Sequence, residues 1–225
     1  MRTKRKIQIT VDALMTAVVL LLMSYSIAGE LLHEILGISM FALLITHHVL
    51  SFAYTKALFK GKRSADKILK IIIDILLCIC ILMMMFSAVI LSKHVFAFLK
   101  INSLSNLSRT LHLLGSYWSF ALMSIHLGFH LDFMLSKAMK KKKNRIIIHS
   151  VLAALSVTGL VFFIREGVYK YMLLINQFVF FDVNSGLVIF LLKYIPIMFM
   201  YASIGYLFIK ILKHGGNKNE KRFRS

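Results

Sequence analysis

The chain has 225 residues, of which 59% are hydrophobic and only 16% are charged, and its mean hydropathy is +0.78. Soluble domains carry about a quarter charged residues, so this composition excludes an ordinary soluble protein. The 28 lysines and arginines outnumber nine acidic residues, which gives a formal net charge of +19. An apolar and basic chain indicates a membrane protein with basic loops or a nucleic-acid-binding protein with a large core, and the order of residues separates these classes.

Six stretches are long and apolar enough to cross a bilayer, which takes about 20 mostly apolar residues in a helix. The alternating ten-residue segments of membrane strands are absent, so we expect helices. The first stretch follows a basic N-terminus, but it is too long for a signal peptide and no small-residue cleavage pattern follows, which indicates an uncleaved anchor. The predicted spans are 11–28, 33–54, 67–91, 107–135, 146–164 and 187–209.

The positive charges are distributed unevenly between the two sides of this predicted bundle. If the N-terminus is cytoplasmic, 22 of the 28 lysines and arginines fall on its side and six on the other. Because cytoplasmic loops are enriched in Lys and Arg, we expect an all-α integral membrane helical bundle with six transmembrane helices and with both termini cytoplasmic. The basic run 140–143 ends a span, so it indicates topology and affinity for anionic lipid rather than for nucleic acid.

This topology divides the chain into a four-helix transmembrane core and smaller flanking regions. It predicts a multi-pass protein of the cytoplasmic membrane, in contact with the lipid bilayer and without a nucleic-acid partner. The expected regions are a cytoplasmic basic N-terminus (1–10), the core (11–135), a cytoplasmic basic loop (136–145), two further transmembrane helices (146–210) and a cytoplasmic basic tail (211–225).

Two cysteines add little to the prediction. Cys78 and Cys80 lie two positions apart in an apolar run, so they point to different sides of a helix. A disulfide framework or a zinc site needs more cysteines, and no Cys-x-x-Cys-His motif for covalent haem attachment occurs. We interpret both as small apolar residues of a helix.

Six of the nine histidines lie inside two predicted spans, where ionisable side chains are costly and usually functional. His33 and His47 are 14 residues apart on the second span, as are His112 and His126 on the fourth. Fourteen residues bring a helix back to within about 40° of the same face and advance it by about 21 Å. The remaining histidines, for which no such role is expected, are His94, His149 and His214 in a loop, at a span end and in the tail.

The depths of the four spaced histidines also match. The second and fourth spans run in the same direction, and His33 and His112 precede the lysines that end these spans by 23 and 25 residues. The corresponding values for His47 and His126 are 9 and 11, so His33 can face His112 while His47 faces His126. A single haem cannot use two ligands about 21 Å apart on one helix, but two stacked haems can, each held by one histidine from each helix.

A second assignment of the inner ligands stays open. His48 and His130 precede the same lysines by 8 and 7 residues, so they also match in depth. The repeated spacing of 14 favours His47 and His126 over this pair. Whichever pair does not ligate iron could hydrogen-bond a haem propionate or a quinone.

Residues beside the histidines are expected to complete the sites. Arg109 lies one turn before His112 and could pair with a haem propionate. Small residues near the first histidine of each span would allow close approach of either a haem macrocycle or a neighbouring helix. Nearby acidic or hydroxyl groups could hydrogen-bond the imidazole nitrogen that does not ligate iron and so orient the ring. The candidates are Gly37 and Gly115 for close approach, and Glu30, Glu34, Ser116 and Ser119 for orientation.

Two stretches, HEILGISMFALLITHHVLSF (33–52) and LHLLGSYWSFALMSIHLGFHL (111–131), resemble the flavinylation-associated cytochrome family. Its signature combines H-E-x-x-G, H-x-x-x-N and L-H-x-x-x-x-Y-W…H-x-G-x-H, and the second stretch matches it more specifically, with Tyr117 and Trp118 at the family's spacing. Ser51 stands where the family often has asparagine, and helices beyond about residue 131 are not covered. The resemblance implies membrane electron transfer with b-type haem and an extracytoplasmic flavoprotein as partner. No flavin-attachment motif occurs in this chain.

The leading prediction is a membrane di-haem b cytochrome that moves electrons between a quinol or cytoplasmic donor and an extracytoplasmic acceptor. Such a chain is an electron-transfer subunit of an oxidoreductase system rather than a stand-alone enzyme. One alternative is a polytopic transporter with an intramembrane histidine relay for protons or metal, although broken helices and inverted repeats are not visible. A less favoured alternative is a di-iron membrane hydroxylase, which needs more histidines gathered at one depth. The predicted iron ligands are His33, His47, His112 and His126.

Overall fold

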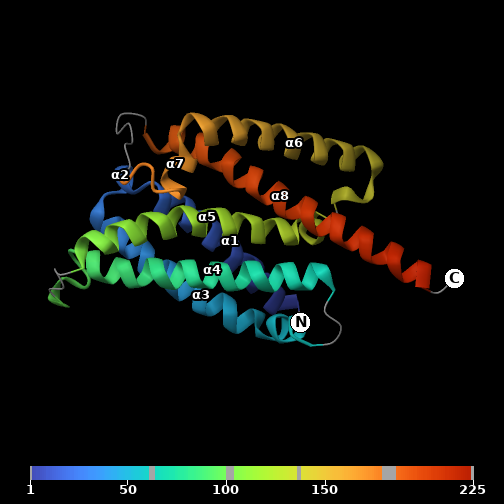
Figure 1. Cartoon of the computed structure of the whole chain (residues 1–225), viewed down its shortest axis with the longest axis horizontal. Coiled ribbons are helices and arrows are strands. Elements are labelled where there is room, and N and C mark those ends of the chain that lie inside the picture. Colours follow the sequence, from blue (N-terminus) through green and yellow to red (C-terminus); the bar gives the residue numbers. More distant parts are fainter. Residues whose placement is uncertain (1, 61–63, 100–103, 136–137, 179–185, 224–225) are drawn as a thin grey trace.

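The computed structural model describes residues 2–60, 64–99, 104–135, 138–178 and 186–223 (Figure 1). All regular structure in these residues is helical, which confirms the predicted all-α class. Six long helices correspond to the six predicted stretches: α1 (Arg2–Met23), α3 (Glu30–Leu58), α4 (Ala65–Leu91), α5 (Ser105–Leu135), α6 (Lys142–Arg165) and α8 (Gly186–Phe223). Short helical segments join them: α2 (Tyr25–Ala28), η1 (Ala97–Leu99), η2 (Ala138–Lys140) and α7 (Val168–Met172).

The ends of the helices differ from the predicted spans. The stretch 11–28 is divided between α1 and α2, and Gly29 then takes a φ of +79°, which glycine adopts without the strain that a side chain brings. The regions expected to be an N-terminal segment and a tail are largely helical, because α1 begins at Arg2 and α8 continues to Phe223. Residues 1, 136–137 and 224–225 of the predicted basic regions lie outside the described residues.

Five helices are long and apolar enough to cross a membrane by length and composition, namely α1, α3, α4, α6 and α8. In the described part of the chain α5 is of similar length but is not among them. Its three histidines and several serines lower its hydropathy, and large parts of its surface are covered by other helices, with Tyr117 and Phe120 almost fully buried. The described structure therefore has several long apolar helices suited to a membrane, and the long helix outside this set, α5, is largely covered by its neighbours.

The long helices pack unequally (Figure 1). α5 lies between α4 and α8, and α6 packs along α8, whereas α3 packs chiefly on α1. The main hydrophobic core lies where α1, α5, α7 and α8 meet, around Phe120, Tyr194 and Ile197. In contrast, Leu58 is the one buried residue of α3, so α3 is held mostly by one neighbour.

Glycines set the contact between α5 and α8. A Cβ atom on Gly128 would overlap the backbone of Ala202, and one on Gly205 would overlap the backbone of Ile125. Small residues let membrane helices approach closely enough for backbone contact. This contact fixes the position of α5, and with it the position of the three histidines that α5 carries.

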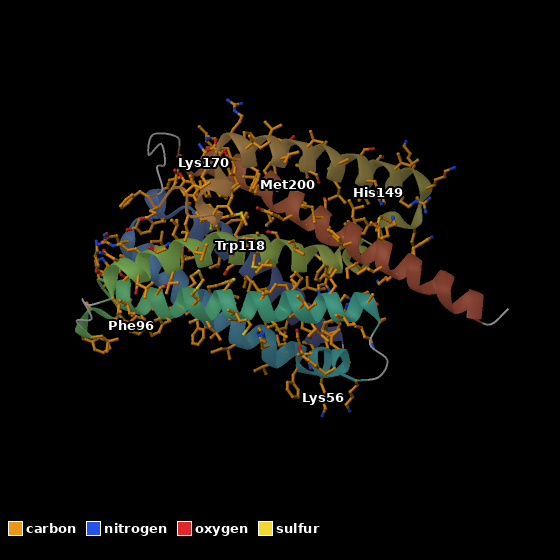
Figure 2. All side chains as sticks on the ribbon, viewed as in Figure 1. Lys56, Phe96, Trp118, His149, Lys170 and Met200 are labelled. Atoms are coloured by element: carbon orange, nitrogen blue, oxygen red, sulfur yellow. The ribbon has the colours of Figure 1, made fainter. Side chains whose placement is uncertain are left out.

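The two termini lie toward the same end of the bundle in Figure 1. Figure 2 shows Lys56 and His149 toward that end, and Phe96 and Lys170 toward the opposite end. Below, the end of α3 that carries His33 is called the His33 end, and the end that carries His47 is called the His47 end.

Candidate functional site

The structure brings His33 and His112 together. His33 lies in the first turn of α3, His112 lies two turns into α5, and their ring centres are 6.0 Å apart with the ring planes inclined by 68°. The two helices have little direct backbone contact with each other, because α3 packs on α1 and α5 packs on α4 and α8. The histidine pair therefore bridges the space between two separately packed helices.

The imidazole of His112 is held from α4. Its Nδ1 lies 3.3 Å from the carbonyl oxygen of Met84 and 3.3 Å from Oγ of Ser87. Ser87 is fully buried, and its hydroxyl donates a hydrogen bond of 2.7 Å to the same carbonyl. A proton on Nδ1 would be directed toward these oxygens, which leaves Nε2 for a ligand.

The imidazole of His33 has a less complete set of partners. The ring of Tyr25 packs edge-on against it, with centres 5.0 Å apart. The Tyr25 hydroxyl donates a hydrogen bond to the carboxylate of Glu30. The Nδ1 atom of His33 is buried and has no hydrogen-bond partner among the described residues. Because buried polar atoms are nearly always paired, this nitrogen is the kind of atom that a bound group would satisfy.

The two glycines beside this pair differ in surroundings. A Cβ atom on Gly37, one turn after His33, would meet no atom within 4 Å. A Cβ atom on Gly115 would lie 3.1 Å from Cβ of Met84 and 3.3 Å from the carbonyl of Cys80, both on α4. Gly115 therefore serves packing between α4 and α5, while the open space lies on the α3 side.

At the His47 end, each of two histidines has its own carboxylate. Nδ1 of His47 lies 2.7 Å from Oδ1 of Asp12 on α1, and Nδ1 of His126 lies 2.7 Å from Oδ1 of Asp74 on α4. Such a carboxylate fixes the ring orientation of a histidine and leaves Nε2 available. The rings of His47 and His126 make no direct contact in the described part of the chain.

The two other inner histidines lie in different surroundings from each other. His48 is exposed and, with Val49 and Phe52, lines a surface hollow of about 360 Å³. His130 lies beside His126, with ring centres 5.1 Å apart, and its ring also packs against Tyr54 at 5.8 Å. His48 thus faces the outside of α3, whereas His130 faces α3 from α5.

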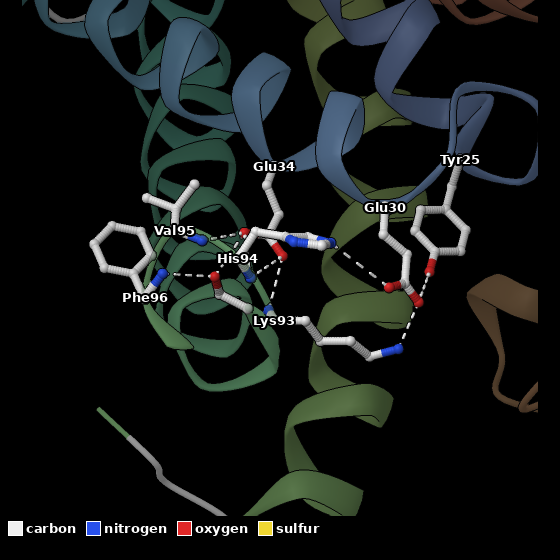
Figure 3. Close-up of polar contacts among 8 residues, drawn as sticks. Tyr25, Glu30, Glu34, Lys93, His94, Val95 and Phe96 are labelled. Carbon is white, nitrogen blue, oxygen red and sulfur yellow. Dashed lines mark hydrogen bonds and ion pairs between the residues drawn. The ribbon is translucent and has the colours of Figure 1, made fainter. Parts of the chain in front are cut away.

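The predicted orienting residues have other partners (Figure 3). Glu34 accepts hydrogen bonds from the hydroxyl of Ser92 and from the backbone N–H groups of the next three residues. Glu30 pairs with Lys93, and this hydrogen-bonded ion pair raises the pKa of Lys93. These carboxylates therefore tie α3 to the segment that follows α4. Of the two predicted serines, Ser116 donates to a carbonyl of its own helix and Ser119 is buried without a hydrogen-bond partner among the described residues.

Three further residues singled out in the sequence lie away from the imidazoles. Arg109 is exposed on the first turns of α5, within electrostatic range of Lys93. Tyr117 stacks on Tyr171 of α7 with ring centres 5.0 Å apart, and Trp118 donates from Nε1 to the carbonyl of Met172. The Tyr117-Trp118 pair therefore fixes α5 to α7.

The sequence reasoning missed Asp12, Asp74 and Ser87. The two aspartates had a visible signal, because each lies inside an apolar run where an acidic residue is costly and usually functional. Ser87 had none, since a serine among methionines and isoleucines is common in helix packing. Asp12 and Asp74 each lie one helix away from the histidine they contact, so no spacing rule along one helix could pair them.

Fold and site together define an all-helical protein with several long apolar helices suited to a membrane, and with histidines gathered between them. Comparisons with family models, with curated proteins and with solved structures found no match. The resemblance to flavinylation-associated cytochromes stays a prediction. Among the described residues, no group of three or more His, Cys, Asp or Glu side chains is placed to hold a metal ion.

Proposed function

We propose that this protein is a membrane electron-transfer protein of the b-cytochrome type, with two haems stacked between α3 and α5. The observation that carries the proposal is the pair His33 and His112, which approach from two helices that are otherwise packed separately. When bound, haem supplies one-electron chemistry at iron, with a potential set by its ligands and their surroundings.

The separation between the rings of His33 and His112 would suit two imidazoles that hold one haem. The observed separation is 6.0 Å. The unpaired Nδ1 of His33 and the open space at Gly37 also fit a group inserted beside α3.

The second site would use His47 and His126. Their Nδ1 atoms contact Asp12 and Asp74, so both rings are oriented and both Nε2 atoms remain for ligation. The exposed position of His48 favours His47 as the ligand, and His130 is then available to a propionate or a quinone. The two sites would be separated by about 21 Å along the helices.

The proposal includes six crossings, with α5 as the sixth. An interior helix needs less hydropathy than one that faces lipid, and α5 is largely covered. Both termini lie toward the end that carries Lys56, and the basic segments would make this the cytoplasmic side of the cell membrane. His47 and His126 would then form the inner site, and His33 and His112 the outer site near Arg109.

The partners follow from this orientation and from the family resemblance. A quinol or a cytoplasmic donor would deliver electrons to the inner site, and an extracytoplasmic flavoprotein would receive them from the outer site. The exposed cations Lys93 and Arg109 lie at that outer end and would meet an acidic partner surface or a propionate.

A second candidate is a transporter with an intramembrane proton relay, which the His47–Asp12 and His126–Asp74 pairs favour. Histidine and carboxylate chains inside membranes commonly carry protons. This reading gives no role to the facing rings of His33 and His112. The hydroxylase has less support, because a di-iron centre requires a larger cluster of ligands than the described residues provide.

The test is haem content. Protein purified after expression with adequate haem supply should show a reduced-minus-oxidised spectrum of low-spin b haem and about two haems per chain by pyridine haemochrome. Protein that is folded, as judged by its helical circular dichroism, but contains no haem would contradict the proposal. In that case proton uptake by proteoliposomes would test the relay.

A further inference from the structure

We propose that Asp12 and Asp74 are positioning residues that make the inner haem site the lower-potential one, so that electrons run downhill toward the outer site. The inference rests on the proposed function and adds a direction to it. Its basis is the different hydrogen-bond acceptor that each imidazole meets at its Nδ1 atom.

The inner imidazoles meet carboxylates. Asp12 comes from α1 and Asp74 from α4, and each contacts one histidine at 2.7 Å. The aspartates are half to one-third exposed, with side-chain values of 50% and 35%. Among the described residues neither Nε2 atom has a hydrogen-bond partner. Two separate helices thus supply the same group to the two ligands.

The outer imidazoles meet neutral groups or none. Nδ1 of His112 faces the Met84 carbonyl and the Ser87 hydroxyl at 3.3 Å. Nδ1 of His33 has no partner among the described residues, and the backbone group that hydrogen-bonds this ring, at Leu22, is neutral. The nearest carboxylate, Glu34, is turned toward the N–H groups that follow Ser92 and does not hydrogen-bond either ring.

The charge of the hydrogen-bond acceptor affects the reduction potential of the haem. An anionic acceptor on Nδ1–H makes the other nitrogen a more basic ligand, and a more basic ligand stabilises oxidised iron relative to reduced iron. Outer-shell hydrogen bonding is one of the ways in which a protein sets a haem potential. Lys70 lies within electrostatic range of Asp74, but the carboxylate is the group that touches the imidazole. Two such contacts at the inner site and none at the outer site should therefore separate the two potentials.

The surrounding charges are a separate influence, because most lysines and arginines lie on the predicted cytoplasmic side and oppose the effect of the carboxylates. At the outer end Glu30 is paired with Lys93, and Arg109 adds a further positive charge nearby. Positive charge favours the reduced form of a nearby centre, because reduction adds an electron. Because the carboxylates touch the inner imidazoles directly, the inner site would still give up an electron more readily, and the outer site would accept it.

The experiment is a spectroscopic redox titration of the purified holoprotein and its variants. His33→Ala removes the outer centre, so the inner centre is read alone in that background. Asp12→Asn and Asp74→Asn keep the shape of the side chain but replace the anionic acceptor with a neutral one. Asp66→Asn removes the same charge from the first turn of α4, where Asp66 is half-buried and contacts no histidine among the described residues, and serves as the matched control.

We expect each asparagine variant to raise the inner midpoint potential, with at least a tenfold change in the reduction equilibrium, or about 59 mV for one electron. Asp66→Asn should change it much less. If an asparagine variant loses the inner haem, the corresponding glutamate variant, Asp12→Glu or Asp74→Glu, is titrated instead. Recovery of a low-potential inner haem in the glutamate variant supports the inference. Loss of haem in the glutamate variant overturns it.

Suppose that Asp12→Asn and Asp74→Asn bind haem and shift the inner midpoint potential no more than Asp66→Asn does. That result would overturn this inference and leave the proposed function intact. A wild-type inner centre with a higher midpoint potential than the outer centre would do the same. Absence of haem from the wild-type protein contradicts the proposed function instead. The two failures are therefore distinguishable in one set of preparations.

Discussion

The two ends of the histidine-bearing helices place imidazoles in different settings. At the His33 end, two rings face each other with centres 6.0 Å apart, and neither touches a carboxylate. At the His47 end, two rings each contact an aspartate at 2.7 Å and do not contact each other in the described residues. The first arrangement is suited to holding a group between two helices, and the second to orienting each ligand separately.

This contrast has a structural cause in the packing of α3 and α5. α5 is fixed by backbone contact with α8 at Gly128 and Gly205, whereas α3 depends on α1 and on the Glu34 contacts at its start. One helix is therefore rigidly placed and the other leaves space beside it. An inserted macrocycle needs both a fixed ligand and a side that can receive it.

The largest expected effect is on haem number. His112→Ala should remove the outer centre and lower the haem content from about two to about one per chain, because the fixed axial ligand is lost. The matched control is His48→Ala, which should keep both centres since His48 faces the surface hollow. If His48→Ala instead loses a haem and His47→Ala does not, the inner ligands are wrongly assigned.

The next effect distinguishes the tight packing of α5 from the open packing of α3. Gly128→Leu should destabilise the protein by about 1–3 kcal/mol or more, because the side chain would have to displace the backbone of α8. A Cβ atom on Gly37 would meet no atom within 4 Å, so Gly37→Leu should cost the haem-free protein much less stability than Gly128→Leu while haem binding at the outer site is weakened. Thermal unfolding in detergent measures the first effect, and haem content measures the second. Equal destabilisation by both substitutions would contradict the difference in packing.

A smaller effect concerns the contacts at the start of α3. Glu34→Gln should cost about 1–3 kcal/mol of unfolding free energy, because three backbone N–H groups and one hydroxyl lose an anionic acceptor. Glu30→Gln should cost less, and its effect should fade in high salt, because its partner Lys93 is exposed. Denaturant unfolding of the two variants in low and high salt provides the comparison, and a larger effect at Glu30 would contradict it.

The smallest effect is expected at Ser87. Ser87→Ala leaves the Met84 carbonyl as an acceptor for Nδ1 of His112, so both haems should be retained and the outer potential should shift less than the inner potential does in Asp74→Asn. Ser116→Ala is the control, since its hydroxyl bonds only to a carbonyl of its own helix. A redox titration in which Ser87→Ala exceeds Asp74→Asn would reverse the ranking of the two sites.

The positions of the long helices could be predicted from the sequence, because they depend on runs of apolar residues along the chain. Apolar runs indicated six helices, and each run overlaps one long helix, although the first run is divided between α1 and α2. Gly29 lies in the gap between the first two predicted spans, whereas the end of α1 at Met23, inside the first predicted span, was not foreseen. The helices α2 and α7 have four and five residues and are too short to give a periodic signal.

The site could be predicted only where it depends on spacing along one helix. The 14-residue repeat led to the pairing of His33 with His112, whereas the aspartates come from neighbouring helices whose rotation no single-helix pattern gives. The glutamates were expected near an imidazole because they are adjacent in sequence. They bind the segment after α4 instead, because its free N–H groups need acceptors.

The most direct test is the axial ligation of the oxidised wild-type protein, measured by low-temperature electron paramagnetic resonance together with near-infrared magnetic circular dichroism. We expect two low-spin centres, each with two imidazole ligands and neither with a methionine, although the chain contains 13 methionines. A high-spin centre, or a methionine ligand at either iron, would contradict the placement of haems between the histidines of α3 and α5.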